Sequence, residues 1–217
     1  QEALLVEADA ALADVRLAGD LVVAAFFGGK KSKEREALRV AYEALYGDVL
    51  SGRRPREEAE GIVAGLRAGE RPVFPFHWEL AFPEVFAREN PGFDAFVGNP
   101  PFMGAIRIAT AAPPTYPAWL SEAYSPAGGQ TDLVAYFFRR SFGLLRFRGT
   151  LGLVATNTIA QGDTRRSGLA EILKREGTIF SARRRVSWPG RAAVTVSIVH
   201  LRRFQGSGSC SLDSVDT

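Results

Sequence analysis

The stretch FDAFVGNPPFMG, residues 93–104, decides the fold of this chain. Its first half, residues 93–98, has the length and the mainly apolar composition of a strand. An amide residue, two prolines and an aromatic residue follow: Asn99, Pro100, Pro101 and Phe102. Two consecutive prolines remove two backbone donors and fix φ twice, so neither a helix nor a strand continues through them. The sequence therefore predicts a strand that ends in a rigid ledge, residues 99–102.

The ledge carries the groups that hold an amine conjugated to a ring. Two acceptors placed against the amine hydrogens localise the nitrogen lone pair, and the Asn99 side-chain oxygen and the Pro100 carbonyl supply two. The Phe102 ring offers a flat surface to a heterocycle, and the prolines keep the set pre-organised. The alternative is a purely structural turn that Asn99 caps.

The pattern downstream of the ledge is typical of an α/β fold. Residues 103–130 read as loop with one helical turn near Trp119. Regular elements then follow: a helix over 131–147, a buried strand over 149–157, a helix over 164–177, and strands over 178–188 and 193–204 joined by the turn 189–191. Since no helix separates the last two strands, we expect a mostly parallel sheet whose last strand is antiparallel. Ligands bind beyond the carboxyl ends of such strands, where the ledge and Asn157 lie.

The first third of the chain predicts a helical segment without recognisable chemistry. Its apolar spacing indicates helices over 1–18, 20–27, 33–47 and 56–69. We expect Gly19 to break the first of these patterns and Ser32 to cap the third helix. The predicted domains are a helical segment (1–70), an α/β segment (71–204) and a flexible tail (205–217).

Charge is distributed unevenly along the chain. Residues 139–203 contain 14 Lys and Arg against three acidic residues, although the net charge of the whole chain is only +3. This favours a polyanionic partner, above all nucleic acid, and the alternative is a merely solvated basic face. The single cysteine, Cys210, and the absence of a long apolar run predict a cytoplasmic protein that does not span a membrane. No His or Cys pair has metal-ligand spacing, so we expect no metal.

The ledge resembles the catalytic motif of S-adenosylmethionine-dependent N6-adenine DNA methyltransferases. The similarity is greatest to type IIG restriction–modification enzymes and related phage-defence methylases. It extends over 71–203 through FHWELAFPEVF (76–86), the run from TDLVAYFF to QGDTR (131–165) and SWPGRAAVTVSIVHL (187–201). The resemblance implies the C-terminal half of a Rossmann-like methyltransferase sheet, and methylation of the N6 amine of an adenine flipped out of double-stranded DNA.

The resemblance also implies a role for individual residues. Asn99 and Pro100 would hold the target amine, Pro101 would keep the ledge rigid, and Phe102 would stack on the adenine. Gly98 and Asn99 would line the cofactor site. Trp188 would be a second aromatic near the base, with core packing as an equal alternative. Asp132 and Asn157 would line the pocket, although Asp132 also suits a helix N-terminus. Four arginines would contact the DNA phosphates: Arg183, Arg184, Arg185 and Arg191. The alternative for the run 183–185, which lies on a predicted strand, is that its outer members simply face solvent.

One feature of these enzymes is missing from the sequence. Their glycine-rich S-adenosylmethionine loop follows a first strand upstream of the ledge, whereas FFGGKKSKE (26–34) lies between predicted helices. We therefore expect a catalytic-half fragment that is inactive alone. Its expected partners are the upstream half of the methyltransferase domain, a target-recognition domain and double-stranded DNA. Two alternatives remain open: an RNA or protein-glutamine N-methyltransferase, and an inactive nucleic-acid-binding remnant.

Overall fold

The structure is a computed structural model that describes residues 2–188, 195–206, 209–213 and 215–216. Its contacts divide the chain into two compact units. The first comprises residues 1–83 with 111–116, and the second comprises 84–110 with 117–217. The domain limits expected at residues 70 and 204 stay predictions. The expected turn 189–191 lies outside the described residues.

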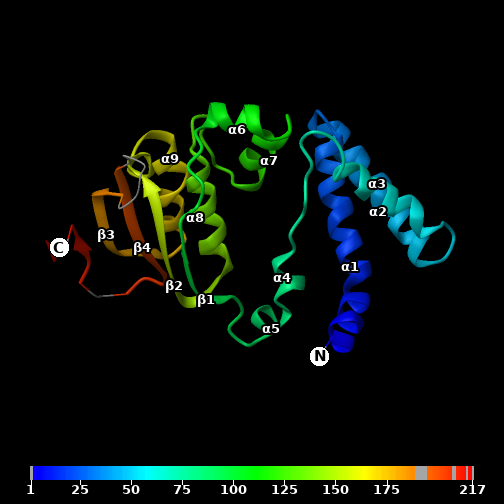
Figure 1. Cartoon of the computed structure of the whole chain (residues 1–217), viewed down its shortest axis with the longest axis horizontal. Coiled ribbons are helices and arrows are strands. Elements are labelled where there is room, and N and C mark those ends of the chain that lie inside the picture. The colour runs from blue at the N-terminus through cyan, green and yellow to red at the C-terminus, as the bar shows by residue number, and fades with distance from the viewer. Residues whose placement is uncertain (1, 189–194, 207–208, 214, 217) are drawn as a thin grey trace. The chain divides into compact units, whose positions relative to one another are not determined.

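The first unit is built on three helices: α1 (Glu2–Gly28), α2 (Ser32–Leu50) and α3 (Arg56–Leu66). They form the blue to cyan part of the ribbon in Figure 1. One apolar side of each helix contributes to a shared core made of Leu17, Leu21, Leu45, Ala59 and Val63. A hydrogen bond of 3.0 Å from the Tyr46 hydroxyl to the Asp14 carbonyl adds a second link between α1 and α2. The predicted helical segment is therefore present.

Two details of this unit differ from the prediction. Gly19 does not break the helix, because α1 runs through it. A Cβ at this position would lie 2.6 Å from the His77 ring, so glycine serves there to let the ring approach the helix. Ser32 is the first residue of α2 and does not cap it: Lys31 is the N-cap and makes no side-chain cap bond.

The second unit contains a six-stranded sheet in its described part, in the order β1-β2-β4-β3-β5-β6. The strands are β1 (Phe93–Gly98), β2 (Leu145–Thr156), β3 (Gly177–Ser187), β4 (Thr195–Arg203), β5 (Ser211–Leu212) and β6 (Val215–Asp216). β1 pairs with β2 in parallel, and β4 lies antiparallel between β2 and β3. β1, β2, β3 and β5 thus run in one direction. This confirms the α/β fold and the antiparallel last long strand.

Helices cover one face of this sheet. α8 (Leu133–Leu144) packs on β2, and α10 (Leu169–Lys174) packs on α8 and β3. Along the chain, α9 (Gly162–Ser167) precedes α10, and it also contacts α8. The core joins side chains of α8 to alternate residues of β2 and β4, and its largest fully buried members include Phe138, Leu145, Leu151 and Leu201. Burial alternates along β2, and the residues between the core positions are half-buried, so the fully buried strand expected from the continuous apolar run is not found.

Several boundaries lie elsewhere than predicted. Residues 103–130 contain two short helices, α6 (Ala105–Ala111) and α7 (Tyr116–Ala123), instead of one turn. Upstream of the sheet, α4 (Trp78–Ala81) and α5 (Pro83–Phe86) are single turns, as the prolines of that stretch require. The chain changes from helix to strand at Leu145, and Gly168 separates α9 from α10. Residues 205–217, expected to be a flexible tail, contribute β5 and β6.

Candidate functional site

The ledge leaves the sheet at the carboxyl end of β1. Gly98, the last residue of that strand, pairs with Leu153 of β2. Asn99 is exposed, and the following Pro100 is buried. Phe102 is half-buried and packs against the core of the second unit. The four residues therefore alternate between solvent and the body of the unit, with Asn99 and Pro101 exposed.

The two acceptors of the ledge are unoccupied by other groups of the described chain. Among the described residues, the Asn99 side chain has no hydrogen-bond partner. In that same part of the chain, no hydrogen bond ends on the Pro100 carbonyl. An amide oxygen and a carbonyl oxygen without donors are available to an external N–H group. The role of Asn99 and Pro100 as an acceptor pair stays a prediction.

The exit of the ledge is fixed by the N-terminus of α8. Asp132 caps this helix: its Oδ1 accepts the Val134 amide at 3.0 Å and also the Met103 amide at 3.2 Å. The Leu133 amide in turn donates to the Met103 carbonyl at 2.9 Å. Both backbone groups of Met103 are therefore bonded to the first residues of α8. Of the two roles that the sequence offered for Asp132, the structure shows the acid at a helix N-terminus. Asp132 also holds the segment that follows the ledge.

A second group of polar side chains anchors the loop before α8 to α9. The Asp132 amide donates to Thr164 Oγ1 at 3.1 Å, and the Gly128 amide donates to Ser167 Oγ at 2.8 Å. The Thr131 hydroxyl lies 2.8 Å from the same Ser167 hydroxyl, and both side chains are buried. Sequence reasoning missed Thr164 and Ser167. Their spacing of three places both hydroxyls on one face of a helix, which is the signal that was available.

Arg139, in α8, holds this loop through hydrogen bonds to backbone carbonyls. Its guanidinium donates to the carbonyls of Ser125 and Pro126 at 3.1 Å each, to that of Ser167 at 3.3 Å, and to that of Tyr124. The residue is 8% exposed. Burial, with a smaller contribution from Arg175, lowers the pKa of this guanidinium below its ordinary value. Arg139 is one of the 14 basic residues of the segment 139–203, but it is buried and holds backbone carbonyls of this loop.

The carboxyl edge of the sheet brings further predicted residues to the same side as the ledge. Asn157 follows β2 at the start of a 3-10 turn, η1 (Asn157–Ala160), and its Oδ1 accepts the buried Ser197 hydroxyl at 2.9 Å. Trp188 follows β3 and is 37% exposed. β2 and β4 separate β3 from β1, so the two strands are about three strand spacings, roughly 14 Å, apart across the sheet. The register places Gly98 level with Ala182, so β3 also runs on past the end of β1 before it reaches Trp188.

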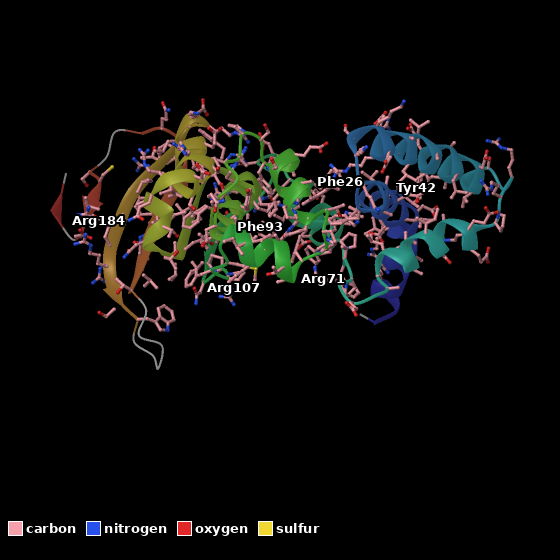
Figure 2. The ribbon with its side chains drawn as sticks, turned by 90° about the horizontal axis from the view of Figure 1, so that it is seen from above. Phe26, Tyr42, Arg71, Phe93, Arg107 and Arg184 are labelled. Atoms are coloured by element: carbon pink, nitrogen blue, oxygen red, sulfur yellow. The ribbon has the colours of Figure 1, made fainter. Side chains whose placement is uncertain are left out.

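The arginine run lies at a bulge in β3. Arg183 pairs with Ile198 and Val186 pairs with Val196, so two residues of β3 face one of β4. All three arginines are exposed, and Arg185 has a φ of +54°. Arg184, labelled in Figure 2, is bonded to Asp213. The Asp213 carboxylate accepts the Arg184 backbone amide at 2.6 Å and its guanidinium at 2.8 and 3.0 Å. Arg191 lies outside the described residues.

The ledge and the helices that hold it fall within one recognised sequence family. The sequence model of the Eco57I restriction-modification methylase family matches residues 32–179. The chain belongs to this family. The match includes the ledge, Asp132, Asn157 and α9, and it ends two residues into the third long strand. No curated protein matches the chain.

Solved structures give more distant similarities to this Eco57I-family chain. The type IIL restriction-modification enzyme MmeI, solved in complex with DNA, is 24% identical with a TM-score of 0.44. The similarity covers 54% of this chain and 16% of the MmeI chain. A putative class I S-adenosylmethionine-dependent methyltransferase from Listeria monocytogenes is 12% identical with a TM-score of 0.39. It covers 57% of this chain and 38% of that one.

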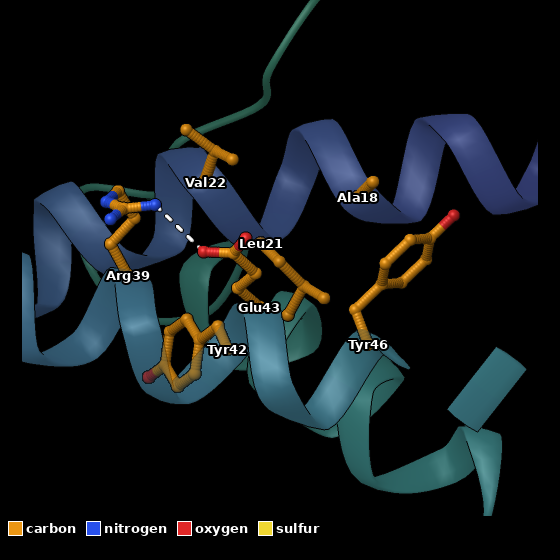
Figure 3. Close-up of a pocket in the computed structure, with 7 residues that line it drawn as sticks. All are labelled: Ala18, Leu21, Val22, Arg39, Tyr42, Glu43 and Tyr46. Atoms are coloured by element: carbon orange, nitrogen blue, oxygen red, sulfur yellow. Dashed lines mark hydrogen bonds and ion pairs between the residues drawn. The ribbon is translucent and has the colours of Figure 1, made fainter. Parts of the chain in front are cut away.

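The first unit of this methylase-family chain contains cavities without evident chemistry. One cavity of about 300 Å³ lies between α1 and α2 (Figure 3). Arg39 and Glu43 at its rim bond to each other at 2.9 Å, and most of the remaining lining is apolar. His77 belongs to a buried polar contact instead: its Nε2 lies 2.9 Å from Asp20, which also accepts Arg67 at 2.6 Å. His77 is therefore a packed residue.

Two searches of the described residues complete the description of this family member. No group of three or more His, Cys, Asp or Glu side chains there is arranged to hold a metal ion. Across the same part of the chain, every helix is too short or too polar to cross a bilayer.

Proposed function

We propose that the chain forms the substrate-holding half of an S-adenosylmethionine-dependent methyltransferase that acts on the N6 amine of adenine in DNA. One observation carries this proposal: the Asn99 side chain and the Pro100 carbonyl, at the carboxyl end of β1, accept no hydrogen bond from the described residues and lie within the stretch matched by a restriction-modification methylase family. The adenine N6 amine has two hydrogens to offer such a pair.

The chain's own residues prepare the amine for reaction. Asn99 Oδ1 and the Pro100 carbonyl each accept one N–H hydrogen of the amine, which localises the nitrogen lone pair that ring conjugation otherwise delocalises. Phe102 presents its ring to the base while its other side packs on the core. Pro101 and the Met103 anchor keep these groups in place before the substrate arrives. The amine nitrogen gains a methyl group and then loses one proton to solvent.

The chain supplies only part of a binding site for the methyl donor. S-adenosylmethionine supplies an activated methyl group, and Gly98 and Asn99 are the residues that would hold it here. A Cβ on Gly98 would lie 3.6 Å from Leu153, an ordinary contact, so the backbone has room on that side. The glycine-rich loop expected of this family is missing from the sequence. Most of the donor site must therefore come from another segment or chain.

The outer edge of β1 indicates where that segment docks. β1 is the edge strand of the described sheet, and Val97 in it is 91% exposed. An open strand edge presents unpaired backbone N–H and C=O groups, with which another strand can pair. We infer that the upstream half of the methyltransferase domain pairs there. A target-recognition domain is the second proposed partner.

Double-stranded DNA is the proposed substrate. An adenine inside a duplex is out of reach, so the base must be flipped toward the ledge. Trp188, at the same edge of the sheet, is the proposed second aromatic. Arg183 and Arg185 are exposed and are proposed to contact phosphates, whereas Arg184 must first leave Asp213. The RNA and protein-glutamine alternatives would use the same acceptor pair. An assay with each substrate therefore distinguishes these alternatives from DNA methylation.

The test is methyl transfer by the intact protein that contains these 217 residues. Labelled S-adenosylmethionine is incubated with unmethylated duplex DNA, and the initial rate is compared with that of Asn99→Ala. We expect the variant to lose roughly 100-fold or more, as when one pre-organised polar group is removed from an active site. Gln130→Ala, which removes another exposed amide side chain and keeps the bond of its backbone amide to Asp163, should leave the rate within a few-fold. Equal rates for Asn99→Ala and wild type would refute the proposal.

A further inference from the structure

A cluster of two phenyl rings and two guanidinium groups lies at the other end of the sheet from the ledge. It consists of Phe147, Arg148, Arg202 and Phe204, here called the aromatic–arginine patch. The register pairs Gly98 with Leu153, five residues along β2 from Arg148. At about 3.3 Å per residue the patch is therefore on the order of 17 Å from the end of β1, and it is a separate surface.

The backbone that presents the patch departs from regular strand geometry. Phe93 pairs with Leu145 and Ala95 pairs with Thr150, so one residue of β1 faces four of β2. Within this bulge Arg148 has a φ of +65°, a conformation that costs a non-glycine residue about 1 kcal/mol or more. Gly149 permits the close return of the chain, because a Cβ there would lie 2.9 Å from the Phe93 carbonyl. Bulges of this kind re-aim side chains.

The bulge is held rigid by bonds to its own backbone. Asn90 Nδ2 donates to the Phe147 carbonyl at 3.2 Å, and the Phe147 amide donates to Asn90 Oδ1 at 3.1 Å. The Asn90 side-chain amide thus bonds to both backbone groups of Phe147, as a neighbouring strand would. Arg146 bonds to Asp94 and adds a second tie. The strained segment is therefore fixed in one position, with Phe147 51% exposed.

The rings and cations of the patch form one continuous surface. The Phe147 and Phe204 centroids are 6.4 Å apart in an edge-to-face arrangement. The Arg148 guanidinium lies 5.7 and 5.9 Å from the two centroids, and that of Arg202 lies 4.7 Å from Phe204. Within the described chain neither arginine forms an ion pair with a carboxylate. Arg202 donates to the Gly206 carbonyl at 2.9 Å, and Phe204 is half-buried. Phe147 and Arg148 are therefore the exposed ring and the exposed cation of the patch.

We infer that the aromatic–arginine patch binds a single-stranded stretch of nucleic acid. Such a strand supplies a planar base and a phosphate at every repeat, which match an exposed ring and an unpaired guanidinium. A duplex offers its phosphates but keeps its bases stacked inside. An acidic peptide satisfies the cations and leaves the rings without a partner. The inference does not depend on the proposed methylation, because it uses no residue of the ledge.

The test is binding of the 217-residue chain to a labelled thymidine oligomer, followed by fluorescence anisotropy at several salt concentrations. Thymine has no exocyclic amine, so the proposed acceptor pair of Asn99 and Pro100 does not contribute to this binding. We expect Phe147→Ala to weaken binding about tenfold through lost stacking. Arg148→Asn removes the charge, and Asn tolerates the positive φ; it should lower the salt slope by about 0.7.

Matched variants elsewhere serve as controls. Phe74→Ala removes another exposed ring, with 69% exposure, and Arg53→Asn removes another exposed arginine. Both should bind the oligomer like wild type. Thermal melting of every variant separates lost binding from lost folding. A uridine oligomer in parallel shows whether the strand is DNA or RNA, and either preference supports the inference. Unchanged binding by Phe147→Ala and Arg148→Asn, or equal binding of a poly-glutamate peptide, would overturn it.

Discussion

Asp132 holds Met103: one carboxylate oxygen accepts the Met103 amide at 3.2 Å and the Val134 amide of α8 at 3.0 Å. Through this shared oxygen a helix cap also becomes the anchor of the segment that leaves the ledge. The entrance of the ledge is fixed by the pairing of β1 with β2, and its exit is fixed by Asp132. Asn99 lies between two anchored points.

Asp132→Ala should remove both bonds and lower the free energy of unfolding by about 1–2 kcal/mol. Asp132→Asn keeps an oxygen in the same place and should remain close to wild type. Urea denaturation of the chain measures both. Asp132→Ser retains a cap, but its shorter side chain does not reach Met103. In the intact protein we expect it to lose methyl transfer while keeping most of its stability. Equal stability of the Ala and Asn variants would contradict the dual role.

Gly19→Ala should destabilise the first unit, because the new Cβ would lie 2.6 Å from the His77 ring. Overpacking of this size costs about 1–3 kcal/mol. Gly61→Ala in α3 is the matched control: nothing lies within 4 Å of the site, so better helix propensity should stabilise by about 0.5–1 kcal/mol. Opposite signs in chemical denaturation are the expected result. Two changes of the same sign would show that the ring moves aside freely.

Asp163→Asn should flatten the acid dependence of stability. Bonds from Arg166 and from the Gln130 amide hold the pKa of Asp163 below its ordinary value. A carboxyl whose pKa is lower in the folded state contributes stability that is fully present above about pH 4 and is lost as the pH falls through the folded value. The unfolding free energy of the variant should therefore fall less steeply than wild type below that pH. An unchanged acid limb would show that the carboxylate adds nothing there.

Asp213→Ala should strengthen binding to duplex DNA, because it releases Arg184 from its carboxylate partner. We expect the slope of log affinity against log salt to steepen by up to about one unit, the value for one added phosphate contact. Arg184→Ala in the wild-type background should change little. Filter binding at several salt concentrations measures both. A large loss with Arg184→Ala alone would mean that the ion pair opens on the DNA.

Local sequence signals predicted much of the second unit. The span of β1 follows from an apolar run closed by Pro100 and Pro101, and α8 follows from its apolar periodicity after Asp132. Both signals are contained within a few residues. The helix-to-strand change at Leu145 was missed, because no proline or glycine stands between Leu145 and Phe147 to mark the end of the helix.

What could not be predicted depends on residues far apart in the chain. The bulge in β2 requires Asn90, 57 positions before Phe147, and Arg184 meets Asp213 across 29 positions. The role of Gly19 becomes visible only when His77 is placed beside it. A sequence pattern records that these residues are polar or small, and the fold decides which partner each one meets.

The central claim is tested most directly by identifying the methylated product. The intact protein is incubated with labelled S-adenosylmethionine and unmethylated duplex DNA, and the DNA is digested to nucleosides and separated. The account predicts label in N6-methyladenine with the wild-type protein and none with Asn99→Ala. Label in RNA or in a glutamine side chain, with none in DNA, would contradict it.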